Sequence, residues 1–166
     1  MIIRNETESD IEAIERITVA AFENHPYSRG TEPFIVRALR AAGALTLSLV
    51  AEEEGEAVGH VAFSPVEIAG RSCGWYCVGP LSVLPARQRR GIGKALILEG
   101  LSRLRSSGAK GCALVGDPDY YRRFGFRNLP ELIHEGIPQE YFLALPFGED
   151  RARGIVVFHE GFRATG

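Results

Sequence analysis

Two glycines beside a group of basic residues form the part of the sequence best suited to bind an anion. Gly91 and Gly93 follow an apolar run that ends at Val83, and they open a segment with helical spacing. Residues without a Cβ let an anion approach the backbone closely, and the first turn of a helix offers free N–H groups and the positive end of its dipole. The nearby basic residues are Arg87, Arg89, Arg90 and Lys94. The pattern predicts a phosphate-binding loop at a helix N-terminus.

Two other phosphate-binding motifs do not fit this segment. A nucleotide P-loop needs a glycine where Gln88 stands and a Ser or Thr where Ala95 stands. The dinucleotide fingerprint needs a third glycine, and Leu96 occupies its place. Glycines also mark ordinary turns, so the Gly-x-Gly spacing alone leaves a plain turn open.

Residues around the glycines make the pattern more specific. Leu81-Ser82-Val83-Leu84-Pro85, followed by Gln88-Arg89-Arg90-Gly91-Ile92-Gly93-Lys94-Ala95-Leu96, resembles the acetyl-CoA motif of the GNAT N-acetyltransferase superfamily, Gln/Arg-x-x-Gly-x-Gly/Ala. Farther along, Tyr121-Arg122-Arg123-Phe124-Gly125-Phe126 is similar to the family's Tyr-x-x-x-Gly-Phe signature. Ile3-Arg4 with Asp10, Ala13 and Ile14 resembles the family's first strand and helix. The run around the tyrosines also looks like a bacterial branch of predicted acetyltransferases.

The resemblance implies acetyl-CoA as the co-substrate and indicates which residues bind it. In the family, a backbone N–H near the end of the fourth strand, here around Val83, holds the oxyanion. The tyrosine matched by Tyr121 protonates the departing thiolate, and a phenol with an ordinary pKa of about 10 is protonated at neutral pH. Tyr120 is the less favoured neighbour, and packing of a short helix is the plainer role for either ring. The expected cofactor-binding residues are Leu81, Ser82, Val83, Gln88, Arg89, Arg90, Gly91, Ile92, Gly93, Lys94, Ala95 and Tyr121.

No residue type identifies the general base. The segment 71–83 has no acidic residue, where several family members have a glutamate. Proton loss from the amine through water is the default, with His60 and Asp117 as the alternative bases. A lone histidine in a strand is more often packed, and an aspartate before Pro118 is typical of a turn.

The elements that position these residues follow from hydrophobic periodicity and turn signals. We expect a hairpin between the second and third strands, and a bulge where Gly79-Pro80 interrupts the fourth, because proline has no N–H to donate. The first helix should begin near Thr7 or Ser9. The predicted strands are 1–4, 44–53, 56–64, 71–83, 111–115, 141–147 and 154–159, and the other predicted helices are 31–42, 91–107 and 120–124.

These elements predict an α+β (mixed α/β) fold, and 166 residues leave room for a single domain, 1–166. The family resemblance implies a mostly antiparallel, twisted sheet that is splayed between its fourth and fifth strands, with helices on both faces. A formal net charge of -2 offers no overall attraction to nucleic acid or to an anionic membrane, so we expect neither as a partner. No run of about 18 apolar residues is present.

The three cysteines are odd in number and lie in apolar runs, which favours buried thiols in a reducing, cytoplasmic compartment. Cys73 and Cys77 lack the spacing and the fourth ligand of a zinc site, so no metal is expected. We expect an enzyme that acetylates a primary amine of a small molecule, a peptide or a protein; the alternative is a non-catalytic acyl-CoA-binding module. By analogy with the family, the acceptor pocket would include Phe22, Tyr27, Arg29 and residues 133–141. Both a monomer and a homodimer are compatible with the sequence.

Overall fold

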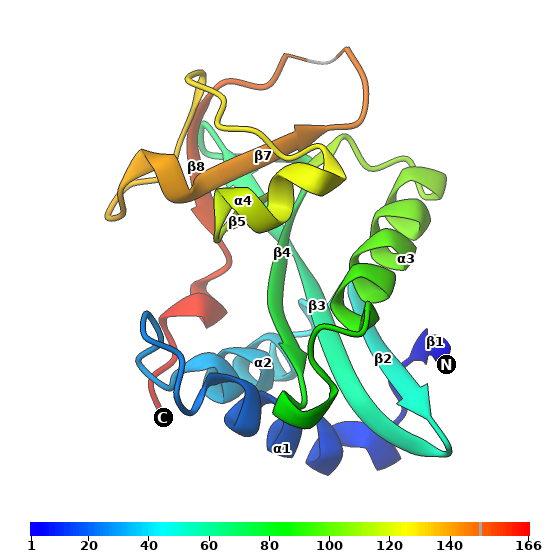
Figure 1. The fold of residues 1–166 in the computed structure, drawn as a ribbon. Helices are drawn as coiled ribbons and strands as arrows, with labels where there is room; N and C mark the ends of the chain where they lie inside the picture. The colour runs from blue at the N-terminus through cyan, green and yellow to red at the C-terminus, as the bar shows by residue number, and fades with distance from the viewer. Residues whose placement is uncertain (150) are drawn as a thin grey trace.

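The computed structural model describes residues 1–149 and 151–166, in which strands form one twisted, mostly antiparallel sheet (Figure 1). Along the sheet the strand order is β1-β2-β3-β4-β5-β7, while β8 pairs with β3 and β6 pairs with β8. Only the β4–β5 and β6–β8 pairs are parallel in the part of the chain described. The strands are β1 (Ile2–Asn5), β2 (Leu47–Glu53), β3 (Glu56–Ile68), β4 (Arg71–Val83), β5 (Gly111–Val115), β6 (Leu132–Ile133), β7 (Phe142–Pro146) and β8 (Gly154–Phe158).

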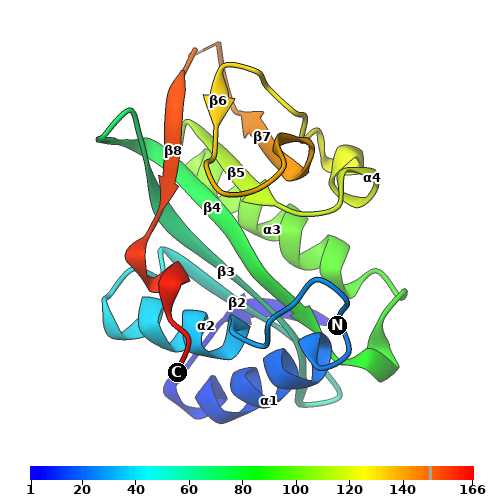
Figure 2. The same cartoon turned by 90° about the vertical axis from the view of Figure 1, so that its left-hand side faces the viewer.

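Helices cover both faces of this sheet, as Figure 2 shows. Side chains alternate along a strand, so Leu49 of β2 packs on the α3 side whereas Val50 packs against the side covered by α1 and α2. Hydrophobic side chains are therefore buried in two layers with the sheet between them. The helices are α1 (Ile11–Phe22), α2 (Glu32–Ala41), α3 (Ile92–Ser106) and α4 (Pro118–Tyr121).

The first helical segment starts at a capping interaction that the sequence predicts. Thr7 N donates to Asp10 Oδ2 at 2.7 Å, and a single turn, η1 (Glu8–Asp10), leads into α1. Arg4 holds the same carboxylate, with Nη1 at 2.7 Å from Asp10 Oδ2, and its Nε donates to Glu52 at 3.1 Å. This contact ties β1 and β2 to the start of α1.

β4 separates from β5 partway along its length. Their parallel pairing ends at Cys77 and Ala113, and no described strand pairs with residues 78–83 on that side. At the same level the β3–β4 ladder shifts by one residue, with the extra residue of β4 around Gly79-Pro80. The bulge predicted from the proline is confirmed, and it coincides with the splay. The last residues of β4 thus present backbone groups to a gap beside the sheet.

Several boundaries differ from the sequence prediction. β3 continues past Ser64 to Ile68, because residues 66–68 gain a second partner in β8. β2 begins at Leu47, where its pairing with β3 begins, and not at residue 44. The expected helix 120–124 is the four-residue α4 followed by η3 (Arg122–Phe124). The sequence does not predict β6, a two-residue strand that depends on β8.

The cysteine prediction is wrong for one of the three residues. Cys77 and Cys112 are buried, but Cys73 is only half-buried, because it lies in the part of β4 near its exposed beginning. No helix within residues 1–149 and 151–166 is long and apolar enough to cross a membrane. The same residues contain no cluster of three metal-ligating side chains.

Candidate active site

The turn between β4 and α3 leaves the first amides of the helix free. After η2 (Pro85–Arg87), the backbone passes through Arg89 (φ 65°) and Gly91 (φ 85°), both in the left-handed region. The first helical bond runs from Ala95 N to Gly91 O at 3.0 Å. The amides of residues 92–94 therefore have no acceptor within the helix, and no described side chain caps them. Free amides and the helix dipole together make this an anion-binding site.

Three exposed basic side chains surround this helix start: Arg89, Arg90 and Lys94. The first turn of α3 contains no acidic residue. Arg87 differs from the other basic residues, because its Nη1 donates to Glu53 Oε1 at 2.8 Å. The positive charge available to an anion thus comes from three of the four basic residues noted in the sequence.

Gly93 lies where three elements meet. A Cβ built on this glycine would be 2.9 Å from the hydroxyl oxygen of Tyr120, 3.7 Å from a methyl of Leu81 and 3.9 Å from a methyl of Val83. The start of α3, the end of β4 and the short helix α4 therefore come together around one bare backbone position. A ligand bound by the helix amides would lie next to the unpaired edge of β4.

Tyr121, the last residue of α4, packs on the α3 side of the sheet. Its ring lies edge-on to Phe126 with centroids 6.0 Å apart, and a Cβ on Gly116 would be 2.5 Å from its Cε2. Burial raises the pKa of Tyr121 well above its ordinary value, and Tyr120, Cys77 and Asp117 increase it further. The phenol therefore keeps its proton at neutral pH and can donate it in a hydrogen bond to a developing thiolate, although the raised pKa makes it a weaker acid than a free tyrosine.

Comparison with known proteins agrees with this geometry. Residues 45–128 match the model of the acetyltransferase (GNAT) domain. An Escherichia coli K12 protein named uncharacterized N-acetyltransferase YhbS is 38% identical over 127 residues, which cover 76% of this chain and 73% of that protein. The chain belongs to the GNAT acetyltransferase family.

Two solved GNAT structures share the whole architecture. A GNAT family acetyltransferase from Brucella melitensis, in complex with acetyl-CoA, is 53% identical, covers 97% of each chain and gives a TM-score of 0.87. Escherichia coli YhbS in complex with CoA is 31% identical, covers 99% of this chain and 93% of its own, and gives a TM-score of 0.90. The fold predicted from the motif resemblance is confirmed.

The cofactor-binding residues predicted for this GNAT chain lie in three neighbouring segments: the end of β4, the turn into α3, and α4. Their side chains do not all face the gap beside β4. Ser82 is 1% exposed and lies on the opposite face of β4 from Leu81 and Val83, and Ile92 is 2% exposed. Ser82 and Ile92 can therefore contribute backbone groups only, and the binding role of the whole set stays a prediction.

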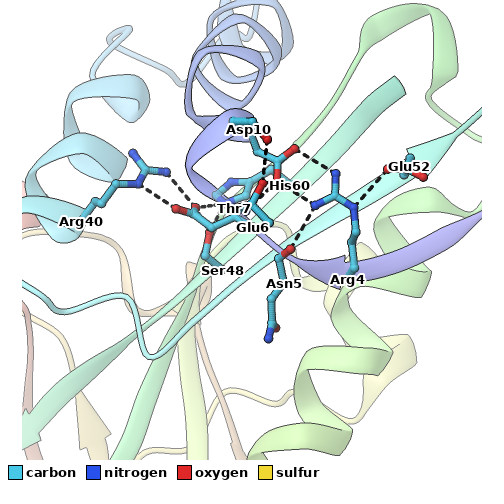
Figure 3. Close-up of polar contacts among 10 residues, drawn as sticks. Arg4, Asn5, Glu6, Thr7, Asp10, Arg40, Ser48, Glu52 and His60 are labelled. Carbon is cyan, nitrogen blue, oxygen red and sulfur yellow. Dashed lines mark hydrogen bonds and ion pairs between the residues drawn. The ribbon is translucent and has the colours of Figure 1, made fainter. Parts of the chain in front are cut away.

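His60, one candidate base of the GNAT chain, is completely buried. Burial lowers its pKa to about 4, although the neighbouring Glu6 opposes the change. Its Nε2 lies 2.7 Å from Ser48 Oγ, within a polar cluster that joins the beginning of the chain, β2 and α2 (Figure 3). The burial argues against direct contact between His60 and an acceptor amine.

Asp117, the other candidate base, has the local role that its sequence context favours. It is the N-cap of α4, and its Oδ1 accepts a hydrogen bond from Asp119 N at 3.0 Å. β4 supplies no carboxylate, as the sequence indicates. Proton loss through water thus stays the default for this GNAT site.

Segments expected to form the acceptor pocket lie on the viewer's side of β4 in Figure 2: the loop between α1 and α2, and the residues between β6 and β7. Tyr27 in the first loop is 87% exposed. In the second, the His134 ring stacks on Phe142 at 5.3 Å and on Phe158 at 4.2 Å, and Phe158 contacts Phe162 at 5.2 Å. We call these four rings the aromatic row. Their contact with an acceptor stays a prediction.

A depression along α1 does not compete with this site. It is shallow and mostly open to solvent, and none of its lining residues belongs to the turn into α3. Three of its lining residues are acidic, which disfavours a polyphosphate ligand. The lining residues are Glu12, Glu15, Arg16, Val19, Ala20 and Glu23.

Gly59 and Gly116 help to position the GNAT site, although the sequence analysis does not select them. A Cβ on Gly59 would be 2.9 Å from Ile92 Cγ2 and 3.1 Å from Leu96 Cδ1, so this glycine lets the start of α3 pack directly on β3. Gly116 does the same for the ring of Tyr121. A glycine inside the strand run 56–64 is the signal that marks such a close approach in advance.

Proposed function

We propose that this chain transfers the acetyl group of acetyl-CoA to a primary amine of a small molecule, a peptide or a protein. The observation that supports this most strongly is the uncapped start of α3, next to the edge of β4 that β5 leaves unpaired. CoA carries a diphosphate and an amide-containing arm, so it matches an anion site that continues into an open strand edge. Membership in the GNAT family supports the same assignment.

In this proposal the diphosphate accepts hydrogen bonds from the amides of residues 92–94. Arg89, Arg90 and Lys94 stabilise its charge, and Gly93 keeps the helix start open to it. The arm lies along residues 81–83 of β4. The thioester would then be held close to the point where β4 leaves β5, on the side that Tyr121 occupies.

The reaction forms a bond between the amine nitrogen and the carbonyl carbon, and it breaks the bond from that carbon to sulfur. A backbone N–H around Val83 stabilises the negative charge that develops on the carbonyl oxygen. Tyr121 donates a proton to the departing thiolate and regains one from solvent, while the nitrogen releases a proton to water. The products are an amide and the CoA thiol. Holding the two reactants together can supply roughly 7 to 11 kcal/mol of the acceleration.

A non-catalytic acyl-CoA-binding module is the second candidate. Three observations about the candidate bases favour it: among the described residues, β4 has no carboxylate, His60 is buried and Asp117 caps a helix. Tyr121, protonated and close to the splay, favours the enzyme instead.

Calorimetric titration of the full chain with CoA, followed by thiol-release assays with acetyl-CoA and a library of amines, tests the proposal. We expect a measurable heat with CoA and faster thiol release with some of the amines. Heat without amine-dependent release across the library supports the binding module. If CoA produces neither a heat of binding nor a thermal shift, both proposed functions are contradicted.

A further inference from the structure

A chain of hydrogen bonds runs from the half-buried Arg40 of α2 to the buried His60 of β3. Glu6, which follows β1, accepts hydrogen bonds from Arg40 Nε at 2.9 Å and Arg40 Nη2 at 2.8 Å. Ser48 of β2 donates to the same carboxylate and also contacts His60. Figure 3 shows these side chains converging from four segments. The carboxylate is ionised at neutral pH: burial opposes ionisation, but the hydrogen bonds from Arg40 and Ser48 outweigh it and lower the pKa of Glu6.

The direction of these bonds determines the tautomer of His60. An ionised carboxylate can only accept, so the single hydroxyl hydrogen of Ser48 goes to Glu6. Ser48 Oγ must then accept from His60, which places the ring hydrogen on Nε2, 2.7 Å away. With the ring neutral, Nδ1 carries a lone pair and no hydrogen. Nδ1 is buried and has no partner among the described residues.

A second unpartnered polar atom lies on the neighbouring strand, directly opposite His60. His60 of β3 and Ser82 of β4 are opposite each other in the antiparallel ladder, so their side chains lie on the same face. Ser82 Oγ is also buried and has no partner among the described residues. The lone pair of His60 Nδ1, which needs a hydrogen-bond donor, thus lies opposite the Ser82 hydroxyl, which can donate. Buried polar groups without partners are rare in folded proteins.

We propose that the Ser82 hydroxyl donates to His60 Nδ1, directly or through one buried water, and that His60 thereby positions the acyl end of β4. Ser82 can turn its hydroxyl among three staggered rotamers without moving the backbone. The completed chain runs from Arg40 through Glu6, Ser48 and His60 to Ser82. It fixes the residue before Val83 relative to α2, the helix that follows the predicted acceptor loop.

The proposal rests on the proposed function, since it concerns the backbone N–H expected to hold the oxyanion. The phosphates would be bound by α3, which is on the other face of the sheet. Loss of the His60–Ser82 contact should therefore lower kcat by a larger factor than it weakens CoA binding, because residues 81–83 would hold only the arm of CoA. His60 touches no substrate in this scheme, so it is a positioning residue.

Four variants and a double variant test the coupling. Ser82→Ala removes the donor; His60→Gln keeps a polar group near the Nε2 position but not at Nδ1; His60→Asn keeps one near Nδ1. We expect Ser82→Ala and His60→Gln each to lower kcat about tenfold, as small misplacements in active sites do, and their double variant to be no slower than either. His60→Asn should retain more activity than His60→Gln. Ser64→Ala is the matched control, because Ser64 Oγ is equally buried and unpartnered but lies opposite Cys77.

Nitrogen NMR of the His60 ring provides a readout that does not depend on activity. We expect the Nε2–H tautomer in the wild type, and a changed Nδ1 frequency in Ser82→Ala but not in Ser64→Ala. An unchanged Nδ1 frequency, or multiplicative losses of kcat in the double variant, would overturn the proposal. A wild type that binds no CoA would instead count against the proposed function and leave the ring measurement interpretable.

Discussion

The hydroxyl oxygen of Tyr120 lies 2.9 Å from the place where a side chain on Gly93 would begin. Such a contact is too close for a Cβ in a packed structure, so any larger residue at this position must displace the phenol. We expect Gly93→Ala to weaken CoA binding about tenfold, in line with overpacking costs of roughly 1 to 3 kcal/mol. Calorimetry of Gly93→Ala in the wild-type and Tyr120→Phe backgrounds checks this. Phenylalanine lacks the clashing oxygen, so the loss should shrink; an equal loss in both backgrounds argues against this contact.

Gly91 matters for a different reason, because nothing lies within 4 Å of a Cβ built on it while its φ is 85°. Only the left-handed backbone conformation requires glycine there. Gly91→Ala should lower the free energy of unfolding by roughly 1 to 2 kcal/mol, and Gly91→Asn by less, since asparagine tolerates this conformation. Chemical denaturation measures both. Gly148→Ala is the control, because Gly148 has equal space and no left-handed φ; an equal effect there would refute the conformational explanation.

Tyr121→Phe should reduce kcat about 100-fold while CoA affinity stays within twofold of the wild type. The phenol is protonated well above neutral pH, so its loss removes an acid and not a charge. Tyr120→Phe is the matched variant on the adjacent residue, whose pKa burial also raises. Steady-state kinetics with the best amine, together with calorimetry, separates the two. If Tyr120→Phe were the slower enzyme, the role of the acid would pass to Tyr120.

The buried His60 predicts how stability depends on pH. Its pKa in the folded chain, about 4, is below the ordinary value of 6.5, so the unfolded chain binds more protons and stability falls as the pH is lowered from 7. Between pH 7 and pH 5 the expected loss is about 2 kcal/mol, from 1.36 kcal/mol per pKa unit. The charged groups near the ring are Glu6, Asp10 and Arg40.

Urea denaturation at several pH values checks this prediction. The two carboxylates near His60, Glu6 and Asp10, have lowered pKa values, so their contribution to the free energy of unfolding is lost mainly below pH 5. Between pH 7 and pH 5 the change should therefore come mainly from His60. His60→Gln should flatten the profile in that window. A wild-type profile that is already flat there would show that the ring titrates normally.

Arg90 and Arg87 should differ in their effect on CoA binding, although both precede α3. Arg90 is exposed beside the free amides, whereas Arg87 is paired with Glu53 at 2.8 Å. Arg90→Gln should weaken CoA binding about threefold, as expected for one charge near a helix terminus, and less at high salt. Arg87→Gln should change it little. Titrations at two salt concentrations decide between them, and equal losses would mean that Arg87 leaves its partner to bind the anion.

Local patterns predict much of this fold, and contacts between distant segments account for the differences. The segments 71–83 and 111–115 match β4 and β5 from end to end, because each is a strand-type run between clear breaks, and the Gly79-Pro80 interruption is accommodated as a bulge within β4. Pro65 is a poor ladder residue, so the sequence predicts an earlier end for β3. The strand continues through it because β8, far along the chain, pairs with the residues that follow.

The candidate site also has one part that the sequence predicts and one part that it does not. The turn into α3 is local, so its glycines and charges can be read from consecutive residues. The environment of His60 is not local: its neighbours Glu6, Ser48 and Ser82 come from segments that only the folded sheet brings together. The sequence therefore does not determine the role of His60, and only the folded sheet reveals its burial and the direction of its hydrogen bonds.

The aromatic row has a consequence for how substrate preference could diversify in this fold. From Phe142 of β7 to Phe162, neighbouring rings lie 4.2 to 5.3 Å apart, with the last pair tilted, and Phe162 packs near Leu39 of α2. Aromatic side chains fill much of the space between packed elements, and paired rings prefer a few defined geometries. The row thus connects the β7 side to the α2 side through side chains that lie outside the phosphate-binding turn and the end of β4. If the predicted acceptor pocket holds the amine, we expect that replacing a ring in this row changes which amines fit without altering the turn and strand end proposed to hold acetyl-CoA.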